Sequence, residues 1–510
     1  MNEIYITDAR AIFTNNLTVD NTIIKGKNFY FGKLEQDFPK INNEKYDLRC
    51  NRILKFLADK LDLSKFDKSE IGIVIGTTNS GIQEFETTQN KHHAELGNPS
   101  EFLKWYLGTT NYAASVSTAC TSGIKAFSTA VKLLQNNVCK VVIVGGIDTL
   151  ASMPSYGFHA LDVLSHKKTN PFSKNRDGIS IGEGGALFIL TKEKPLNDET
   201  IQILGLGETS DAYHSATPNP KGEQAQVAIE KALQDANLAP KDIGYINLHG
   251  TGTISNDVME ANAIYNVFGS NVPVSSTKPY TGHCLGAAAS IETFICYEIL
   301  KNKKNLPLHK YDGEYDKTLP ILNLIDKEIS SKNINNCMCT SFGFGGTNAV
   351  IIIGKTQEEK YLPVEKVLPH AHPMILIDRI LDVNIEEQIV KASVKIHENK
   401  IFFDKEIDGI SPLVGIEFMA QTIGCYAFYK SQLSNPKLGF LLGTRQYENS
   451  LEKFENGKTY TITAKEIYGD NELVSFECFI YNENTNGDWV AKAIINTFQP
   501  QNADGYLEKL

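Results

Sequence analysis

One cysteine separates two segments of different character in Ser-Thr-Ala-Cys-Thr-Ser-Gly, residues 117–123. The preceding run, residues 112–116, is small and apolar, as a buried strand would be. After the cysteine, apolar residues recur at intervals of three and four, which predicts a helix. Cys120 is therefore expected at or just before a helix N-terminus, where free N–H groups and the helix dipole stabilise a thiolate or an oxyanion. The alternative is that Cys120, one of nine cysteines, is simply buried, the usual fate of a free cysteine.

Two histidines further along the chain lie in segments of loop composition. His249 lies in Ile-Asn-Leu-His-Gly-Thr-Gly-Thr, residues 246–253, and His283 in Ser-Thr-Lys-Pro-Tyr-Thr-Gly-His-Cys-Leu-Gly, residues 276–286. Loops on a rigid scaffold often carry chemistry, although a lone histidine in such a place is more often structural. Together with a cysteine at a helix start, the two histidines would supply a pair of hydrogen-bond donors beside a nucleophile.

Four ordered motifs in residues 1–355 resemble those of the β-ketoacyl-acyl-carrier-protein synthases. They are S-T-A-C-T-S-G, H-G-T-G-T, S-T-K-P-Y-T-G-H and S-F-G-F-G-G-T-N. The resemblance implies a thiolase-like, five-layered α/β domain built from two similar halves, each with a five-stranded sheet. It also implies a decarboxylative condensation: the cysteine takes an acyl chain from the carrier protein as a thioester, and malonyl carrier protein then loses carbon dioxide and attacks it.

The same resemblance assigns roles to individual residues. Cys120 is the expected nucleophile, and His249 and His283 are expected to stabilise the enolate oxygen; no metal or cofactor is expected. The family also forms homodimers through the strand near its nucleophile, so a homodimer is expected. Cys120 comes about forty residues earlier than in the family, so part of the usual dimer surface or substrate cap must be shortened.

Further positions match the family's supporting residues. Lys278 and Glu292 fall at supporting catalytic positions, and Phe344 matches a gate residue whose N–H would form the oxyanion hole with that of the cysteine. Asp257 and Glu260 match acidic positions after the first histidine motif, and we interpret them as structural.

Composition limits the classes of function. The chain has 510 residues, which requires at least two domains, and its net charge of −10 argues against nucleic acid as the main partner. It has no run of eighteen apolar residues and begins without a signal-like segment, and its odd number of cysteines suits a reducing compartment, so a cytoplasmic location is expected. Acyl carrier proteins are acidic, and Lys301, Lys303 and Lys304 are a candidate docking cluster unless they only form a solvated helix end.

Hydrophobic patterns predict alternating strands and helices in the first domain. Residues 141–144 form a β-branched run that predicts a buried strand ending in a turn at Gly145-Gly146. Residues 224–236 predict a helix and residues 245–248 another strand. The spacing of Cys337-Met338-Cys339 is too tight for a usual zinc pair and is expected within a strand. Alternation of this kind indicates an α/β domain.

The polar segment 355–360 predicts a domain boundary, with a second domain over residues 361–510. Residues 460–464 and 474–478 alternate as half-buried strands do, and Asn486-Gly487 is a hairpin signal. The long apolar helix predicted over residues 413–429 completes an α+β domain, an antiparallel sheet around one helix.

Two features of the second domain could do chemistry. Glu417 lies in the apolar helix, where a carboxylate is costly unless it is paired or functional. His370 and His372 lie in Leu-Pro-His-Ala-His-Pro-Met, residues 368–374; they could bind a metal, but no third ligand presents itself.

With the later Glu-Phe-Met-Ala-Gln, these segments of residues 361–500 resemble the hot-dog-fold 3-hydroxyacyl carrier protein dehydratases. The segment Gly-Phe-Leu-Leu-Gly-Thr-Arg, residues 439–445, brings the chain closer to dehydratases of aryl-polyene pathways. The resemblance implies that His370 takes the C2 proton and Glu417 assists loss of the 3-hydroxyl as water, across a two-fold interface with one residue from each protomer. In housekeeping dehydratases Arg and Tyr follow the histidine, and Pro-Gly begins the helix; here Ala371 and His372 follow, and residues 411–413 are Ser-Pro-Leu.

The sequence thus predicts one polypeptide with two enzymes, a synthase and a dehydratase, that act on carrier-bound chains before and after a separate ketoreductase. Because no enoyl reductase is fused, a conjugated polyene, such as an aryl polyene, is the expected product. The alternatives are ordinary fatty-acid synthesis and a non-catalytic scaffold resembling a chain-length factor; Cys120 and the two histidines argue against the scaffold.

Overall fold

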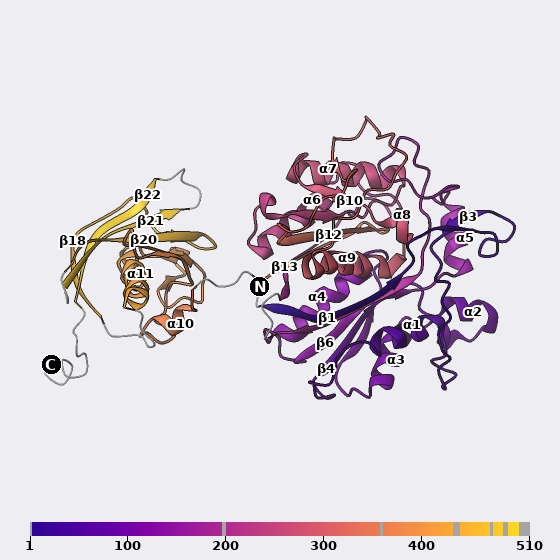
Figure 1. The fold of residues 1–510 in the computed structure, drawn as a ribbon, viewed down its shortest axis with the longest axis horizontal. Coiled ribbons are helices and arrows are strands. Elements are labelled where there is room, and N and C mark those ends of the chain that lie inside the picture. Colours follow the sequence, from indigo (N-terminus) through magenta and orange to yellow (C-terminus); the bar gives the residue numbers. More distant parts are fainter. Residues whose placement is uncertain are drawn as a thin grey trace. The chain divides into compact units, whose positions relative to one another are not determined.

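The chain divides into two units, residues 1–356 and 357–510, and no hydrophobic cluster of the described residues contains members of both. The computed structural model describes residues 3–195, 200–356, 361–431, 439–469, 473–482 and 488–498 (Figure 1). Residues 357–360 of the predicted linker and the Asn486-Gly487 turn lie outside the described residues. Each unit is treated separately below.

The first unit is built on one eleven-stranded mixed sheet with an internal repeat. The strands, in order across the sheet, are β11 (Asn323–Leu324), β10 (Pro273–Ser275), β9 (Tyr245–Asn247), β12 (Asn336–Gly343), β13 (Thr347–Lys355), β8 (Ile201–Ser210), β1 (Ile4–Phe13), β7 (Gly184–Thr191), β6 (Val141–Asp148), β4 (Ile71–Gly76) and β5 (Ala113–Val116). In the orders β10-β9-β12-β13-β8 and β5-β4-β6-β7-β1, the first three strands are parallel and the next two antiparallel. The two halves join where β1 pairs antiparallel with β8.

Helices lie between the two halves and outside them. They are α1 (Arg49–Ala58), α2 (Ile82–Thr88), α3 (Asn98–Leu107), α4 (Ser122–Gln135), α5 (Ser152–Ala160), α6 (Glu223–Ala236), α7 (Ile254–Phe268), α8 (Lys278–Thr281) and α9 (Ala288–Asn302), with short 3-10 turns η1 (Lys91–Ala94), η2 (Pro240–Asp242) and η3 (Leu285–Ala287). Helices α4 and α9 contact each other and strands of both halves, whereas α1 and α3 pack on the first half and α6 on the second (Figure 1). This arrangement gives helix, sheet, helix, sheet and helix layers. A two-stranded hairpin, β2 (Thr18–Asp20) and β3 (Phe29–Phe31), lies apart from the large sheet.

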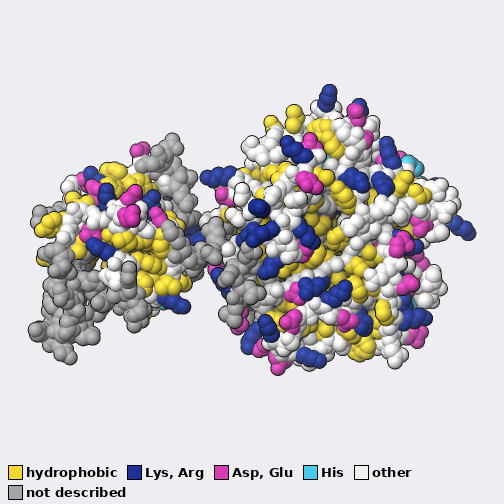
Figure 2. All heavy atoms as spheres, in the orientation of Figure 1, with side chains coloured by type: hydrophobic (Ala, Val, Ile, Leu, Met, Phe, Trp, Pro, Cys, Tyr) yellow, Lys and Arg dark blue, Asp and Glu magenta, His cyan; other side chains and the backbone are white. Residues whose placement is uncertain are grey.

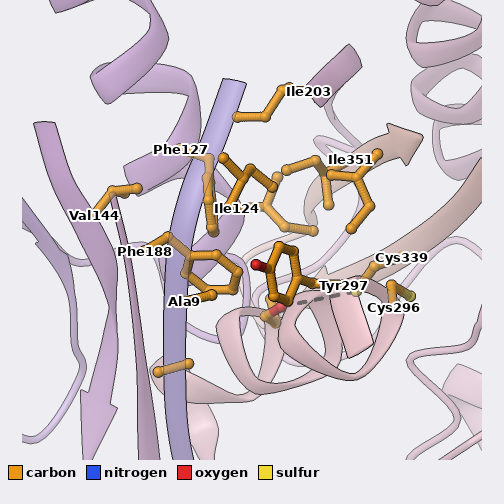
Figure 3. Packing of buried hydrophobic residues seen from close by; sticks show 14 of the residues in the cluster. Ala9, Ile124, Phe127, Val144, Phe188, Ile203, Cys296, Tyr297, Cys339 and Ile351 are labelled. Carbon is orange, nitrogen blue, oxygen red and sulfur yellow. Dashed lines mark hydrogen bonds between the residues drawn. The ribbon is translucent and has the colours of Figure 1, made fainter. Parts of the chain in front are cut away.

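The central core of the first unit is formed by side chains from both halves. Figure 3 shows Phe127 of α4, Phe188 of β7 and Tyr297 of α9 among Ile351 of β13 and Ile203 of β8. The rings of Phe127 and Phe188 are 4.9 Å apart in an edge-on arrangement that aromatic pairs prefer. This packing fixes α4 and α9, whose N-terminal ends face the candidate site.

One turn predicted in this unit is wrong. Strand β6 continues through Gly145 and Gly146 to Asp148 rather than turning there. A Cβ atom on Gly145 would lie 1.8 Å from the carbonyl oxygen of Ala186 on β7, so the glycine is required for close strand pairing. The predicted helix 224–236 and strand 245–248 are confirmed as α6 and β9, each within one residue at its ends, and the Cys337–Cys339 segment lies in β12.

The second unit wraps an antiparallel sheet around a single long helix. The sheet order is β14 (Arg379–Asn384), β15 (Ile389–Lys395), β20 (Thr459–Gly469), β21 (Leu473–Asn482), β22 (Trp489–Phe498) and β18 (Phe440–Asn449). A smaller sheet contains β16 (Phe403–Asp404), β17 (Gly409–Ile410) and β19 (Phe454–Glu455), and the helices are α10 (Val364–Val367), the 3-10 turn η4 (Pro412–Val414) and α11 (Gly415–Lys430). Helix α11 packs against β14, β15, β20, β21 and β22, and the predicted α+β pattern is confirmed.

Several compositional features have a structural counterpart. All nine cysteines are buried free thiols. Among the described residues, every helix is too short or too polar to span a bilayer. Figure 2 shows basic and acidic side chains interspersed on the visible face of the first unit rather than one single-sign region. In the proposed docking cluster, Lys304 forms an ion pair with Glu298, so at least one of its three charges is neutralised.

Candidate active site

Cys120 lies two residues before helix α4 and four residues after the end of strand β5, between a strand and a helix as predicted. The preceding residue, Ala119, has φ = 56°, a left-handed conformation that is strained for a residue with a side chain. The turn leaves Cys120 only 8% exposed at the end of the helix. The tight turn at Ala119 therefore places the sulfur atom of Cys120 beside the N-terminus of helix α4.

Both predicted histidines meet this cysteine. His249 follows β9 and His283 follows α8, and both side chains are almost fully buried. The Sγ atom of Cys120 is 3.1 Å from Nε2 of His283, and the two imidazole rings are 5.2 Å apart at 88°. The fold thus brings into one cluster three residues that are separated by 129 and 34 positions in the sequence.

The hydrogen bonds on the far side of each ring fix the tautomer of both histidines. The backbone N–H of Leu285 donates to Nδ1 of His283 at 3.2 Å, and the ammonium of Lys278 donates to Nδ1 of His249 at 3.3 Å. An ammonium group has no acceptor, so Nδ1 must accept, and in a neutral ring the proton is then on Nε2. Burial, with the charge of Lys278, holds the pKa of both imidazoles well below its usual range, so both rings are neutral. Two Nε2–H donors therefore converge beside Cys120.

The same constraint disfavours a metal ion at this cluster. The sulfur and one nitrogen of each histidine lie within 4.8 Å of one another, which is compatible with metal ligation by distance alone. However, a metal at Nε2 needs that nitrogen deprotonated, and the donors at Nδ1 hold the proton on Nε2. The nearby ammonium of Lys278 also repels a cation.

Lys278 is itself held by Glu292. The Lys278 side chain is fully buried, and its ammonium forms an ion pair and hydrogen bond with the Glu292 carboxylate on α9. Burial raises the pKa of Glu292 to about 7, and Lys278 opposes that rise. A buried charge needs such a partner, and removing one member of a buried pair typically costs about 3–5 kcal/mol.

Two further acidic residues hold the backbone around His249, as the structural interpretation predicted. Glu260 accepts from the backbone N–H groups of His249 and Gly250 at 2.7 and 2.6 Å, and burial raises its pKa to about 7. Asp257 accepts from the N–H groups of Phe172 and Gly252, and burial raises its pKa to about 6. These carboxylates satisfy loop N–H groups that would otherwise be buried without partners.

The cysteine differs from expectation in its ionisation. Burial raises the pKa of Cys120 to about 11, although Lys278 and the backbone N–H of Phe344 favour the thiolate. The helix end therefore does not suffice to make a resting thiolate, because desolvation outweighs it. The N–H of Phe344 does face the sulfur, which places it where an oxyanion donor would be useful.

A partly enclosed pocket leads to these groups. Phe344 lines it with Phe158 of α5, and the two rings are 5.7 Å apart. Gly345 has φ = 84°, so the segment after Phe344 adopts a conformation that favours glycine. Thr251 and Thr253 also line the pocket; sequence reasoning did not single them out, although they stand in the His-Gly-Thr-Gly-Thr motif.

In the second unit, His370 and Glu417 are brought together. Nε2 of His370, after α10, is 3.8 Å from Oε1 of Glu417, in the first turn of α11, and each side chain is about one-third exposed. His372 instead faces Glu365, at 3.5 Å, and its side chain is 69% exposed. Gln421, which sequence reasoning missed, donates a hydrogen bond to Glu417. Its position four residues later in the same helix could have suggested this contact.

The proximity of His370 and Glu417 bears on one expectation. The resemblance predicted that one protomer gives the histidine and its partner the glutamate, whereas within one chain the two side chains already lie 3.8 Å apart. The turn after His370 is tied directly to the helix that carries Glu417, so a pair within one chain is an alternative to the shared site.

Comparisons with known proteins agree with this geometry. Residues 56–195 and 201–312 match the N-terminal and C-terminal domains of β-ketoacyl synthase, and residues 362–508 match the ApeP dehydratase family. The chain is 31% identical over 328 residues to 3-oxoacyl-[acyl-carrier-protein] synthase 2 of Staphylococcus aureus strain COL, covering 58% of this chain and 78% of that protein.

Solved structures show the same relationship. The structure of the ApeO ketosynthase with its chain length factor ApeC from Xenorhabdus doucetiae matches with a TM-score of 0.66 and 32% identity, covering 70% of this chain and 98% of that chain. A ketosynthase bound to its acyl carrier protein, AntDE:AntF, matches with a TM-score of 0.61 at 20% identity, which shows the fold alone.

The chain belongs to the β-ketoacyl-acyl-carrier-protein synthase family. Its first unit has the thiolase-like ketosynthase fold, and its second unit matches a dehydratase family. The polypeptide therefore combines a condensing synthase with a dehydratase.

The buried thiol of Cys120 predicts an unusual pH dependence of alkylation. Because its pKa is about 11, the thiolate fraction, and with it the rate of Cys120 modification by iodoacetamide, should rise about tenfold per pH unit from pH 7 to pH 10. Peptide mass spectrometry after timed alkylation measures this rate, with a short cysteine peptide as the control. A rate that levels off below pH 8 would show a resting thiolate and contradict the assignment.

The same-chain pairing of His370 and Glu417 predicts the result of mixing two variants. Co-expressed H370A and E417Q chains should show no dehydration beyond that of either variant alone, because every chain lacks one member of its own pair. Sites shared between chains would instead leave one intact pair in each mixed dimer. Differently tagged variants, purified by both tags in sequence, provide mixed assemblies for this assay if the chain forms oligomers.

Proposed function

We propose that the first unit condenses an acyl chain with malonyl carrier protein and that the second dehydrates the 3-hydroxyacyl carrier protein formed after separate ketoreduction. The observation that carries the first part is the convergence of two Nε2–H donors beside a cysteine at a helix end. Such donors suit a thioester oxygen that becomes negatively charged, and they need no strong base.

In the acyl-transfer step, the sulfur of Cys120 attacks the thioester carbonyl of the acyl carrier protein. The backbone N–H groups of Cys120 and Phe344 hold the developing oxyanion, the carrier's sulfur leaves, and it receives the thiol proton. The acyl chain is then a thioester of Cys120. The gate position of Phe344 beside the pocket suits exchange of one carrier-bound substrate for the next.

In the condensation step, malonyl carrier protein loses its carboxylate as carbon dioxide, and the electron pair becomes an enolate. His249 and His283 donate from Nε2 to the enolate oxygen, and Lys278 with Glu292 holds His249 in the donating tautomer. The enolate carbon attacks the acyl carbonyl and displaces the sulfur of Cys120 as a thiolate, and the one proton that the reaction consumes comes from solvent and restores the thiol. Removing one such donor typically lowers the rate about 10²–10³-fold.

In the dehydration step, His370 removes the C2 proton and Glu417 gives a proton to the 3-hydroxyl, which leaves as water. After one turnover the histidine carries the extra proton and the glutamate lacks one. Each side chain is about one-third exposed, so exchange with solvent returns both groups to their starting states. We assign the second unit to the hot-dog fold, on the match to the ApeP family and the sheet wrapped around α11.

The pathway proposed is that of an aryl polyene or related conjugated chain. A synthase fused to a dehydratase creates double bonds in carrier-bound chains. The likeness to the ApeO ketosynthase supports the same pathway, whereas ordinary fatty-acid synthesis is the alternative. The decisive experiment incubates the chain with malonyl and acyl carrier protein and a ketoreductase, and follows carrier-bound products by mass. Conjugated products support the proposal, and stalling at the 3-hydroxyacyl stage contradicts it.

We also propose that the synthase unit pairs with a second copy through β5. This strand is at the edge of the eleven-stranded sheet, and Trp105 of α3 and Tyr112 beside it are 48% and 41% exposed. An exposed strand edge with aromatic neighbours is a natural place for continued pairing.

Replacing Cys120 should separate the two activities. C120A should abolish self-acylation and condensation. The rate of dehydration of supplied 3-hydroxyacyl carrier protein should stay within about twofold of wild type, because Cys120 lies in the first unit and His370 and Glu417 lie in the second. Carrier-bound masses report both reactions. Condensation near the wild-type rate would remove Cys120 from the mechanism.

Replacing either histidine should affect decarboxylation more than acylation. H249A or H283A should lower carbon dioxide release from malonyl carrier protein about 10²-fold or more, and self-acylation of Cys120 much less, because backbone N–H groups serve acylation. Carbon dioxide release and the acyl-enzyme mass are measured separately. Equal losses in the two rates would mean that the histidines activate the thiol. The control variant is H92A, because the His92 side chain is exposed, whereas His309 is buried and its replacement could disturb packing.

A further inference from the structure

Gln421 is a fully buried amide whose four hydrogen-bonding positions are all used. Its Oε1 accepts from the backbone N–H groups of Leu376 and Ile377 at 2.8 and 3.4 Å. Its Nε2 donates to the carbonyl of Met374 at 2.7 Å and to Oε1 of Glu417 at 2.9 Å. The amide therefore joins one face of α11 to the segment that follows His370.

The orientation of this amide is determined by its partners. Two backbone N–H groups can only donate, so the amide oxygen must face Leu376 and Ile377, and the opposite assignment would place N–H against N–H. The amide nitrogen must then face Glu417. Consequently Oε1 of Glu417 accepts a hydrogen bond in every protonation state.

This acceptance has a consequence for acid catalysis. When the Glu417 carboxyl is protonated, an oxygen that already accepts from Gln421 is the poorer place for the proton, so the proton resides on Oε2. Oε1 is also the oxygen 3.8 Å from Nε2 of His370. One oxygen thus faces the amide and the histidine, while the other is left to carry the proton toward a substrate.

We infer that Gln421 is a positioning residue of the dehydratase: it holds Glu417 beside His370 within one chain and directs the acid proton to Oε2. This inference rests on the proposed function of the second unit. Gln421 acts through Glu417 and does not itself contact the reacting atoms.

The segment after His370 has other attachments that should keep a Gln421 variant folded. The ammonium of Lys400 donates to the carbonyl of Leu376 and to Asp378, each at 2.7 Å, and the Asp378 carboxylate also accepts from the N–H of Lys395. Loss of the amide should therefore loosen Glu417 and the turn rather than release the whole segment.

The principal test is Q421M, which keeps the length of the side chain and removes both donor and acceptor. We expect kcat for dehydration to fall about 10- to 100-fold, with KM changed less than about threefold, because misplacement of a catalytic group affects the chemical step. Condensation by the first unit should be unchanged. The matched control is T422V, the next residue of α11, whose hydroxyl bonds only within the helix, to Phe418; its kcat should stay within about twofold of wild type.

A double-mutant cycle separates positioning from a general structural role. Glu417→Asp keeps a carboxyl group but withdraws it by one methylene from the amide, so adding Q421M to it should cost less than about threefold. If Gln421 had only a structural role, Q421M would lower kcat by the same factor in wild type and in E417D, and that result would overturn the inference.

Q421N provides a second route if Q421M does not fold. Asparagine keeps both donor and acceptor but is shorter by one methylene, so it cannot hold Glu417 and the backbone of Leu376 and Ile377 at the same time, and a folded variant with reduced kcat is expected. A wild-type kcat in Q421N or in Q421M would overturn the inference. If E417Q itself dehydrates at the wild-type rate, the proposed function of the unit fails instead, which distinguishes the two failures.

Discussion

The chemistry of the synthase unit depends on what the two histidines accept at Nδ1. A backbone N–H at one ring and a buried ammonium at the other leave both rings with a proton on Nε2, facing Cys120. Much of the surrounding structure serves this constraint. Glu292 neutralises Lys278, Glu260 and Asp257 satisfy the loop around His249, and burial keeps the rings neutral so that they donate without titrating.

The repeat in the sheet explains how residues so distant in sequence meet. Strand β5 and strand β10 hold equivalent places in the two halves, and each is followed by a segment that leads into a central helix, α4 or α9. Cys120 comes from the first such segment and His283 from the second, while Glu292 comes from α9 itself. Because α4 and α9 contact each other, the two segments converge. The packing of Phe127 against Phe188 therefore matters to catalysis, although neither residue approaches the sulfur.

The sequence was most informative where chemistry and chain geometry agree. Cys120 at a helix start, His249 and His283 in glycine-flanked loops, and the apolar helix around Glu417 could be predicted because each combines a reactive residue with a recognisable local pattern. What escaped prediction depends on contacts between distant segments. Gly145 is required within β6 because the Ala186 carbonyl of β7 lies where a side chain would be. The thiol of Cys120 stays protonated because it is buried. Gln421 holds the backbone of Met374, Leu376 and Ile377, which come far earlier in the chain.

The two units meet opposite demands on proton chemistry. Condensation needs hydrogen-bond donors that do not exchange protons, and the synthase excludes water from His249 and His283, which are 1% and 3% exposed. Dehydration needs a base and an acid that are reset after each turnover, and the side chains of His370 and Glu417 are about one-third exposed and face each other. Burial therefore agrees with the different roles proposed for the histidines in the two units. The imidazoles proposed as fixed donors are enclosed, whereas the one proposed to accept and return a proton stays within reach of a carboxyl group and of solvent.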